Sequence, residues 1–192
     1  IINVGMSIGV GLIPEHGENI DELLANADLA LMAAKNNGRG RAEVFARSLG
    51  ERNRRKLTLE HELRRALANK QFTLYWQPKV QTEDWYICGA EALLRWNHPT
   101  LGQIPPSEFI PVAEAAGLIN EIGTWVMKEA CRVAAKELPG LTISINASPA
   151  QLQRTDFIMH VDAALSLAGL PPDHLEVEIT ESLFMDASPV AL

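Results

Sequence analysis

The stretch Ile87-Cys88-Gly89-Ala90-Glu91-Ala92-Leu93-Leu94-Arg95-Trp96 decides how this sequence folds. It is apolar enough for a buried β-strand, and it places Glu91, Leu93 and Arg95 on one face, because successive side chains of a strand point to opposite faces. A strand covered by helices on both sides is usually apolar throughout. The charged face therefore predicts that this strand borders a polar centre as well as a hydrophobic core.

Two later segments show the same division into an apolar and a polar face. The apolar positions are Leu141, Ile143, Ile145, Leu175, Val177 and Ile179, and the polar positions are Thr142, Ser144, Asn146, Glu176, Glu178 and Thr180. In a βα barrel, inward residues at the carboxyl ends of the strands form the site, so we expect Glu91, Asn146 and Glu178 to converge.

Carboxylate and amide oxygens suit Mg²⁺ or Mn²⁺ better than zinc, and Arg95 adds a cation for a phosphate. A single glutamate at a strand end is more often a solvated or ion-paired carboxylate. The prediction of a metal-assisted site therefore rests on Glu91, Asn146 and Glu178 together.

The rest of the chain predicts alternating strands and helices, which favours βα units and a mainly parallel sheet. Strands are predicted over 1–13 (buried), 42–45, 72–76, 85–96, 141–147 and 175–180, and helices over 19–37, 109–116, 119–138 and, for the most part, 149–169. Asn19 is the expected N-cap of its helix, and Asp156 that of a later one. Gln77-Pro78 is expected to end the strand over 72–76.

The composition is that of an ordinary globular protein, and the alternation of strands and helices makes the expected fold class α/β. The 192 residues carry 17 Lys and Arg against 24 Asp and Glu, a net charge of −7, which argues against a binder of nucleic-acid polymers. Two cysteines without a CxxC pair exclude a zinc ribbon or a disulfide scaffold. With no apolar span or leader, the expected compartment is the cytoplasm. Both ends are expected to continue into a longer protein, which could be membrane-anchored.

Six motifs give the sequence from about residue 58 onward a family resemblance. They are Gln77-Pro78-Lys79-Val80, Glu91-Ala92-Leu93-Leu94-Arg95-Trp96, Phe109-Ile110-Pro111-Val112-Ala113-Glu114, Gly117-Leu118-Ile119, Ile145-Asn146-Ala147-Ser148 and Glu178-Ile179-Thr180-Glu181-Ser182. In this order they resemble the EAL-domain family. The resemblance implies a TIM-like barrel with an antiparallel first strand. It also implies hydrolysis of the bacterial second messenger cyclic di-GMP to pGpG with Mg²⁺ or Mn²⁺.

The resemblance also implies roles for individual residues. Glu91, Asn146 and Glu178 match the metal ligands of the family, Arg95 a phosphate contact, Gln77 a residue of the substrate groove, and Glu181 a glutamate that supports a catalytic loop. The family has further catalytic parts after the point that corresponds to Leu192, including the expected base. Because the sequence accounts for about half of the strands of the family's barrel, we expect residues 1–192 alone to be inactive and weakly stable.

The first part of the chain is similar to the C-terminal tail of a GGDEF domain, the diguanylate cyclase family. The similarity is carried by Ser7-Ile8-Gly9, by Ala27-Asp28-Leu29-Ala30-Leu31-Met32-Ala33-Ala34-Lys35 and by Gly38-Arg39. It implies that Lys35 and Arg39 contact nucleotide phosphates, so GTP is a possible ligand there. The expected organisation is a GGDEF tail over 1–45, a basic helical linker over 46–57 and the beginning of an EAL domain over 58–192.

The expected function of the longer protein is that of a cyclic di-GMP phosphodiesterase, most readily as a homodimer. Two alternatives stay open at this stage. The protein could be a catalytically degenerate receptor for cyclic di-GMP or GTP, or a bifunctional cyclase and phosphodiesterase. The metal-ligand residues Glu91, Asn146 and Glu178 favour the enzyme, because a pure receptor has no need of them.

Overall fold

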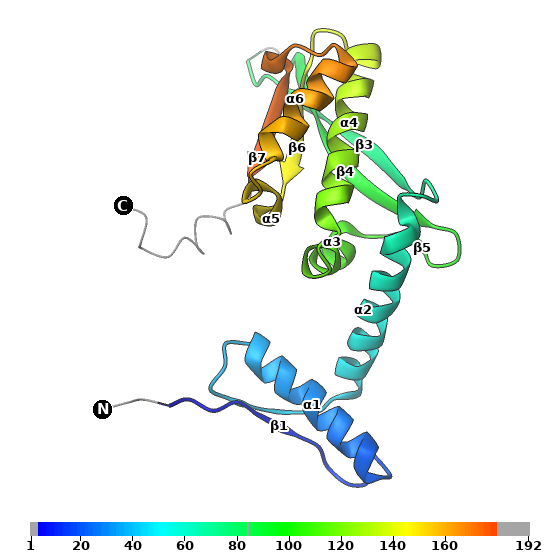
Figure 1. Cartoon of the computed structure of the whole chain (residues 1–192), viewed down its shortest axis with the longest axis vertical. Helices are drawn as coiled ribbons and strands as arrows, with labels where there is room; N and C mark the ends of the chain where they lie inside the picture. Colours follow the sequence, from blue (N-terminus) through cyan, green and yellow to red (C-terminus); the bar gives the residue numbers. More distant parts are fainter. Residues whose placement is uncertain (1–3, 84, 180–192) are drawn as a thin grey trace. The chain divides into compact units, whose positions relative to one another are not determined.

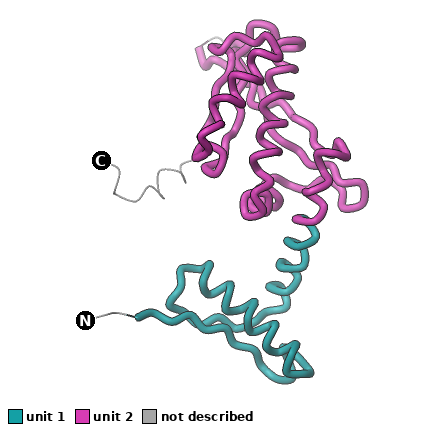
Figure 2. The backbone as a smooth tube through the Cα atoms, viewed as in Figure 1, with its two compact units in different colours: residues 1–59 teal, residues 60–192 magenta. Residues whose placement is uncertain are grey.

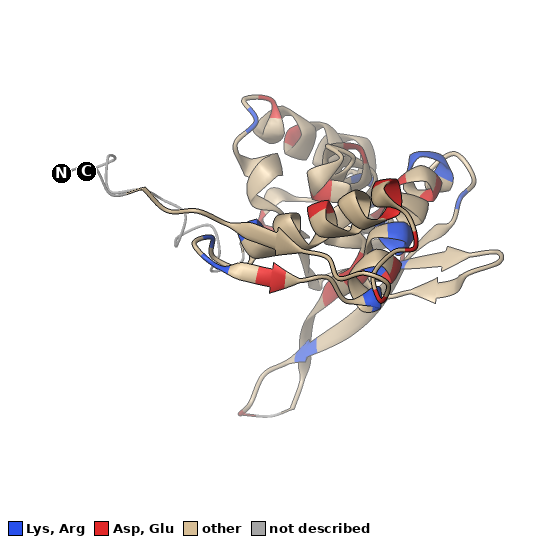
Figure 3. Cartoon of the chain, turned by 90° about the horizontal axis from the view of Figure 1, so that it is seen from below, with Lys and Arg blue, Asp and Glu red and all other residues tan. Residues whose placement is uncertain are grey.

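The structure of the chain is a computed structural model that describes residues 4–83 and 85–179. The chain divides into two compact units, residues 1–59 and residues 60–192 (Figures 1 and 2). Figure 3 shows acidic and basic residues mixed along the described helices.

The first unit is built on a parallel strand pair joined by a helix. Strand β1 (Ile8–Val10) pairs with β2 (Ala42–Val44), and helix α1 (Ile20–Asn36) connects them. Asn19 is the N-cap of α1, as predicted, and its Oδ1 accepts a hydrogen bond of 2.9 Å from the backbone N–H of Glu22. The helix ends at Asn36, with Gly38 at φ 104°, a conformation that favours glycine.

The prediction of a buried strand over residues 1–13 is wrong for the residues that the structure describes. The strand covers Ile8–Val10, and Val4, Met6 and Ile13 are each more than two-thirds exposed. The physical reason is that β2 is the partner of β1 in a two-stranded sheet, so the apolar side chains on either side of this short pair have little to pack against.

Helix α2 (Arg47–Ala66) contains the basic segment that was predicted to be a helical connector. Its last turns restore an apolar stripe, in which Leu59, Leu63 and Ala66 are buried. Arg64 near its end pairs with Glu60 one turn earlier, with 2.8 Å between Nη2 and Oε1.

The second unit is built around a five-stranded mixed sheet. Its strands are β3 (Phe72–Val80), β4 (Ile87–His98), β5 (Gly102–Ile104), β6 (Thr142–Ala147) and β7 (Leu175–Ile179). The order is β3-β4-β6-β7, with β5 beside β4. The pairs β4–β6 and β6–β7 are parallel, whereas β3–β4 and β4–β5 are antiparallel. The antiparallel β3 agrees with the first strand implied by the family resemblance.

Two features of this sheet differ from the sequence prediction. Strand β3 does not end at Gln77-Pro78 but continues to Val80. Pro78 is tolerated because β3 is an edge strand of the described sheet, where a missing backbone N–H costs little. The short β5 was not predicted, because three residues after a turn carry no periodicity that distinguishes a strand from a loop.

The connecting helices follow the predicted segments closely. They are α3 (Pro106–Ala115), α4 (Ile119–Glu137), α5 (Pro149–Leu152), α6 (Phe157–Ala168) and the 3₁₀ turn η1 (Pro172–His174). Asp156 occupies the N-cap position of α6, but its side chain does not cap the helix and instead pairs with Arg154. Among the described residues, no helix is long and apolar enough to cross a membrane.

An aromatic cluster forms the centre of the core beneath β3 and β4. The Trp96 and Phe109 rings are fully buried, with centroids 5.6 Å apart in an edge-to-face arrangement, and Phe72 lies 6.0 Å from each. The indole Nε1 of Trp96 donates a hydrogen bond of 2.9 Å to Oε1 of Gln71. This packing fixes the end of β4 on its apolar face and leaves the opposite face to the polar residues.

Candidate metal and phosphate site

The register of the sheet brings the predicted polar residues to one face. Gln77 of β3 lies directly opposite Glu91 of β4, and Asn146 of β6 lies opposite Glu178 of β7. Ile143 and Ile145 are buried on the other face of β6, as the alternation predicted. Three adjacent strands therefore each contribute one of the predicted metal ligands.

Glu91 and Asn146 are in direct contact. Asn146 Nδ2 donates a hydrogen bond of 2.6 Å to Oε1 of Glu91. A half-turn of the amide places Oδ1 where Nδ2 lies, so that the carboxylate and an amide oxygen face the same point. The geometry brings these two predicted residues together.

Glu178 accepts a hydrogen bond from Lys79, a residue for which the sequence predicted no role. Lys79 Nζ donates hydrogen bonds to Oε1 of Glu178 at 2.7 Å and to Oε2 of Glu176 at 3.0 Å. It also donates to Oγ of Ser144, a hydroxyl that is fully buried. The Ser144 hydroxyl in turn donates to Oε2 of Glu176 at 2.8 Å.

These contacts shift two pKa values in the directions that keep the cluster charged. The hydrogen bond to Glu178 is the largest cause that raises the pKa of the Lys79 ammonium above its usual value, with Glu176 adding to it. The hydrogen bond from Lys79, followed by that from Ser144, lowers the pKa of the Glu176 carboxyl.

Arg95 lies further along the same face of β4. Its guanidinium carbon is 5.3 Å from the centroid of the Tyr75 ring, a cation–π contact, and its Nη1 donates to the Leu94 carbonyl oxygen at 2.9 Å. The Tyr75 ring is half exposed. The contact leaves most of the five N–H donors of the guanidinium available to an anionic group such as a phosphate.

A cavity of about 650 Å³ borders the ends of β4 and β6. Arg95, Leu93 and Asn146 line one side, and residues of α3, α4 and α5, including Glu114, Gly123 and Gln151, line the other. The cavity combines an apolar wall with a few polar groups, which is the usual composition of a small-molecule site.

The donor set fits a hard divalent cation in kind. Glu91, Asn146 and Glu178 offer carboxylate and amide oxygens, which Mg²⁺ and Mn²⁺ prefer. Within residues 4–83 and 85–179, no group of three or more His, Cys, Asp or Glu residues is placed to hold a metal ion. These residues supply two carboxylates and one amide, a partial ligand set.

Two of the other predicted residues, Lys35 and Arg39, belong to the first unit. Lys35 is in the last turn of α1, and Arg39 follows that helix at φ 58°; both side chains are exposed in the first unit. Glu181 and Thr180 fall outside the described residues.

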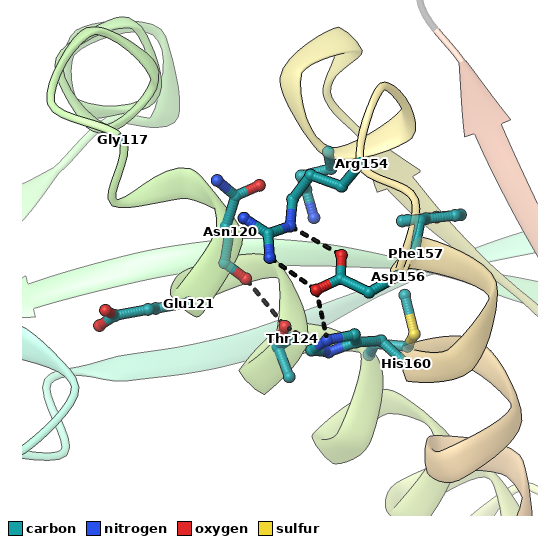
Figure 4. Close-up of a pocket in the computed structure, with 10 residues that line it drawn as sticks. Gly117, Asn120, Glu121, Thr124, Arg154, Asp156, Phe157 and His160 are labelled. Atoms are coloured by element: carbon teal, nitrogen blue, oxygen red, sulfur yellow. Dashed lines mark hydrogen bonds and ion pairs between the residues drawn. The ribbon is translucent and has the colours of Figure 1, made fainter.

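A second polar cavity, of about 490 Å³, lies between α4 and the segment that leads into α6 (Figure 4). Arg154 and Asp156 form a two-pronged ion pair there, with N–O distances of 2.8 and 2.6 Å. This pair lowers the pKa of Asp156 to about 2. His160 Nε2 is 3.6 Å from the same carboxylate, and its Nδ1 is 3.2 Å from Oγ1 of Thr124.

The fold defines a class of protein: a mixed α/β sheet of the TIM-like type, with carboxylate and amide oxygens and an arginine on one face of its strands. Residues 60–191 match the family described as "EAL domain", so the chain belongs to the EAL-domain family. Residues 1–41 match the family "Diguanylate cyclase, GGDEF domain".

Two curated relatives match nearly the whole of this chain. The chain is 41% identical to the "Bifunctional diguanylate cyclase/cyclic di-GMP phosphodiesterase MucR" of Pseudomonas aeruginosa, over 100% of the chain and 29% of that protein. It is also 41% identical to the "Cyclic di-GMP phosphodiesterase NbdA" of the same organism, over 93% of the chain and 23% of that protein. The chain therefore spans less than a third of the length of these relatives.

Solved structures support the same fold. The "PaMucR Phosphodiesterase, c-di-GMP complex" superposes with a TM-score of 0.64 at 42% sequence identity, covering 68% of this chain and 54% of that one. This likeness supports the EAL-type fold.

Proposed function

We propose that the full-length protein containing this chain hydrolyses cyclic di-GMP to linear pGpG with Mg²⁺ or Mn²⁺. The observation that carries the proposal is the arrangement of Glu91, Asn146 and Glu178 on one face of three adjacent strands, with Arg95 on the same face of β4. The relatives named as cyclic di-GMP phosphodiesterases support this choice of substrate.

Each residue has a defined task in this proposal. Glu91, Asn146 and Glu178 hold the divalent cation, which, when bound, supplies Lewis-acid stabilisation to a phosphodiester and makes water more acidic. Arg95 binds a phosphate oxygen of the dinucleotide, with its guanidinium oriented by Tyr75. Gln77, opposite Glu91, orients the dinucleotide with its amide group. Other parts of the full-length protein supply the remaining metal donors, the base and the loop that Glu181 supports.

The first unit supports a second candidate activity. The match of residues 1–41 to the diguanylate cyclase family favours a nucleotide site at Lys35 and Arg39, with GTP as the ligand. A protein with both parts would resemble the bifunctional relative and would act as a homodimer. GTP-dependent formation of cyclic di-GMP by the full-length protein is the measurement that separates this candidate from hydrolysis alone.

The test of the main proposal is a hydrolysis assay on the full-length protein. We expect conversion of cyclic di-GMP to pGpG with Mn²⁺ and no conversion after chelation of the metal. Glu91→Ala should abolish turnover, because the substitution removes a carboxylate ligand. Turnover by Glu91→Ala at saturating Mn²⁺ would contradict the proposed ligand set.

A further inference from the structure

Lys79 reaches the predicted metal site by crossing a neighbouring strand. Lys79 lies on edge strand β3, opposite Gly89 of β4. Its side chain contacts residues of β6 and β7, which lie on the far side of β4. Gly89 has no side chain on the face that Lys79 shares, and a Cβ there would lie 3.8 Å from the Cβ of Lys79. The glycine therefore leaves the surface of β4 open for the long lysine side chain.

The contacts of Lys79 connect it to two carboxylates at once. Glu176 and Glu178 are neighbours on one face of β7, and both accept a hydrogen bond from the same ammonium group. Without this cation, two negative charges two residues apart on one face of a strand would repel each other. The local charge of the three groups is −1 with Lys79 present and −2 without it.

One of these contacts involves a carboxylate oxygen that the proposed function assigns to the metal. Oε1 of Glu178 is bound to Lys79, and Glu178 is one of the three proposed metal ligands. A cation at Lys79 therefore stabilises the carboxylate when no metal is present, and it repels a divalent cation that approaches the same carboxylate.

From this geometry we infer that Lys79 is a charge-compensating residue of the metal site. It stabilises the metal-free arrangement of Glu176 and Glu178 and weakens the binding of the divalent cation. The inference rests on the proposed function for its second part. Lys79 is a positioning residue here, because it acts through the carboxylates of Glu176 and Glu178.

The test compares the full-length protein with Lys79→Met, which keeps the length of the side chain and removes its charge. Two quantities are measured without substrate: the midpoint of urea unfolding of the chelator-treated protein, and Mn²⁺ affinity by electron paramagnetic resonance. We expect a lower unfolding midpoint and Mn²⁺ binding that is tighter by about tenfold or more. Lys128→Met, on an exposed position of α4, is the matched control and should change neither quantity.

A double variant separates charge from packing. Lys79→Met combined with Glu176→Gln returns the local charge to −1, so we expect both the unfolding midpoint and the Mn²⁺ affinity to return toward those of the unsubstituted protein. Should Lys79→Met fail to fold, folding of the double variant supports the inference and its failure overturns it. Unchanged or weaker Mn²⁺ binding by Lys79→Met, or a double variant no more stable than the single, also overturns it.

The two proposals fail in different ways. If the unsubstituted protein binds no Mn²⁺, the proposed function is wrong. The role of Lys79 as a counter-charge is then decided by the unfolding midpoints of the metal-free variants. If the unsubstituted protein binds Mn²⁺ and the Lys79→Met variant behaves identically in both measurements, the proposed function stands and the inference is wrong.

Discussion

Replacing Gly89 by alanine tests how closely the site depends on strand packing. A Cβ at Gly89 would lie 2.4 Å from the backbone carbonyl oxygen of Thr142 on β6. An ordinary contact begins near 3.4 Å, so β4 and β6 must separate locally by 3.4 − 2.4 = 1.0 Å. The obstacle is backbone, which cannot rotate away, and such overpacking typically costs about 1–3 kcal/mol of unfolding free energy.

The same displacement reaches the proposed ligands. Glu91 is two residues beyond Gly89, and its 2.6 Å hydrogen bond with Asn146 joins the same two strands. A separation of this size stretches that contact to about 3.6 Å, past the limit of a hydrogen bond. A misplacement of about 1 Å in a catalytic group can lower turnover by about 100-fold.

The assay for Gly89→Ala is urea unfolding together with cyclic di-GMP hydrolysis by the full-length protein. The control is Gly5→Ala, where an added Cβ meets nothing within 4 Å. We expect a loss of stability and of turnover for Gly89→Ala and neither for the control. Wild-type stability and turnover in Gly89→Ala would refute the reasoning that the β4–β6 contact positions the ligands.

Three further predictions follow from the same structure. Ca²⁺ should inhibit the full-length protein where Mg²⁺ or Mn²⁺ supports turnover, because Ca²⁺ takes more ligands at longer distances; equal rates with Ca²⁺ as the sole metal would count against the site. Arg154→Met should raise the pKa of Asp156 from about 2 toward 3.8, as followed by NMR titration of the carboxyl carbon. Because the folded-state pKa of Asp156 is depressed, the stability that this ion pair contributes is present above about pH 3.8 and is lost as the pH falls through about 2. The difference in unfolding midpoint between Arg154→Met and wild type should therefore shrink as the pH falls over that interval. Residues 1–192 expressed alone should show no hydrolysis of cyclic di-GMP with Mn²⁺, since the described residues supply a partial ligand set; clear formation of pGpG would contradict this.

The polar face of the sheet could be predicted because strand alternation is a local property. Glu91, Asn146 and Glu178 each lie on the polar face of a strand whose other face is apolar. The pairing of β4 with β6 and of β6 with β7 makes these strands neighbours. The parallel pairing of β4, β6 and β7 follows from the helices between them, which make long crossover connections.

Lys79 was missed because its role depends on where a strand ends. The prediction stopped β3 at Gln77-Pro78, and a proline inside a strand is normally a sign of its end. An edge position removes that objection, but edge positions are set by tertiary structure and not by local sequence. Once β3 continues to Val80, alternation places Lys79 on the same face as Gln77.

Asp156 shows a second limit of local signals. An aspartate before a helix predicts a capping carboxylate. Here Arg154, two residues earlier, binds both carboxylate oxygens, and a charged partner forms stronger hydrogen bonds than a backbone N–H. The position of the helix start was therefore predicted correctly, whereas the role of the side chain was wrong.

The most direct test of the proposed site is anomalous X-ray diffraction from crystals of the full-length protein grown with Mn²⁺. The account predicts a manganese peak within about 2.5 Å of oxygens from Glu91, Asn146 and Glu178. Crystals of Glu91→Ala should lose the peak or show it much weakened. A manganese peak elsewhere, with none beside these three residues at saturating Mn²⁺, would contradict the central claim.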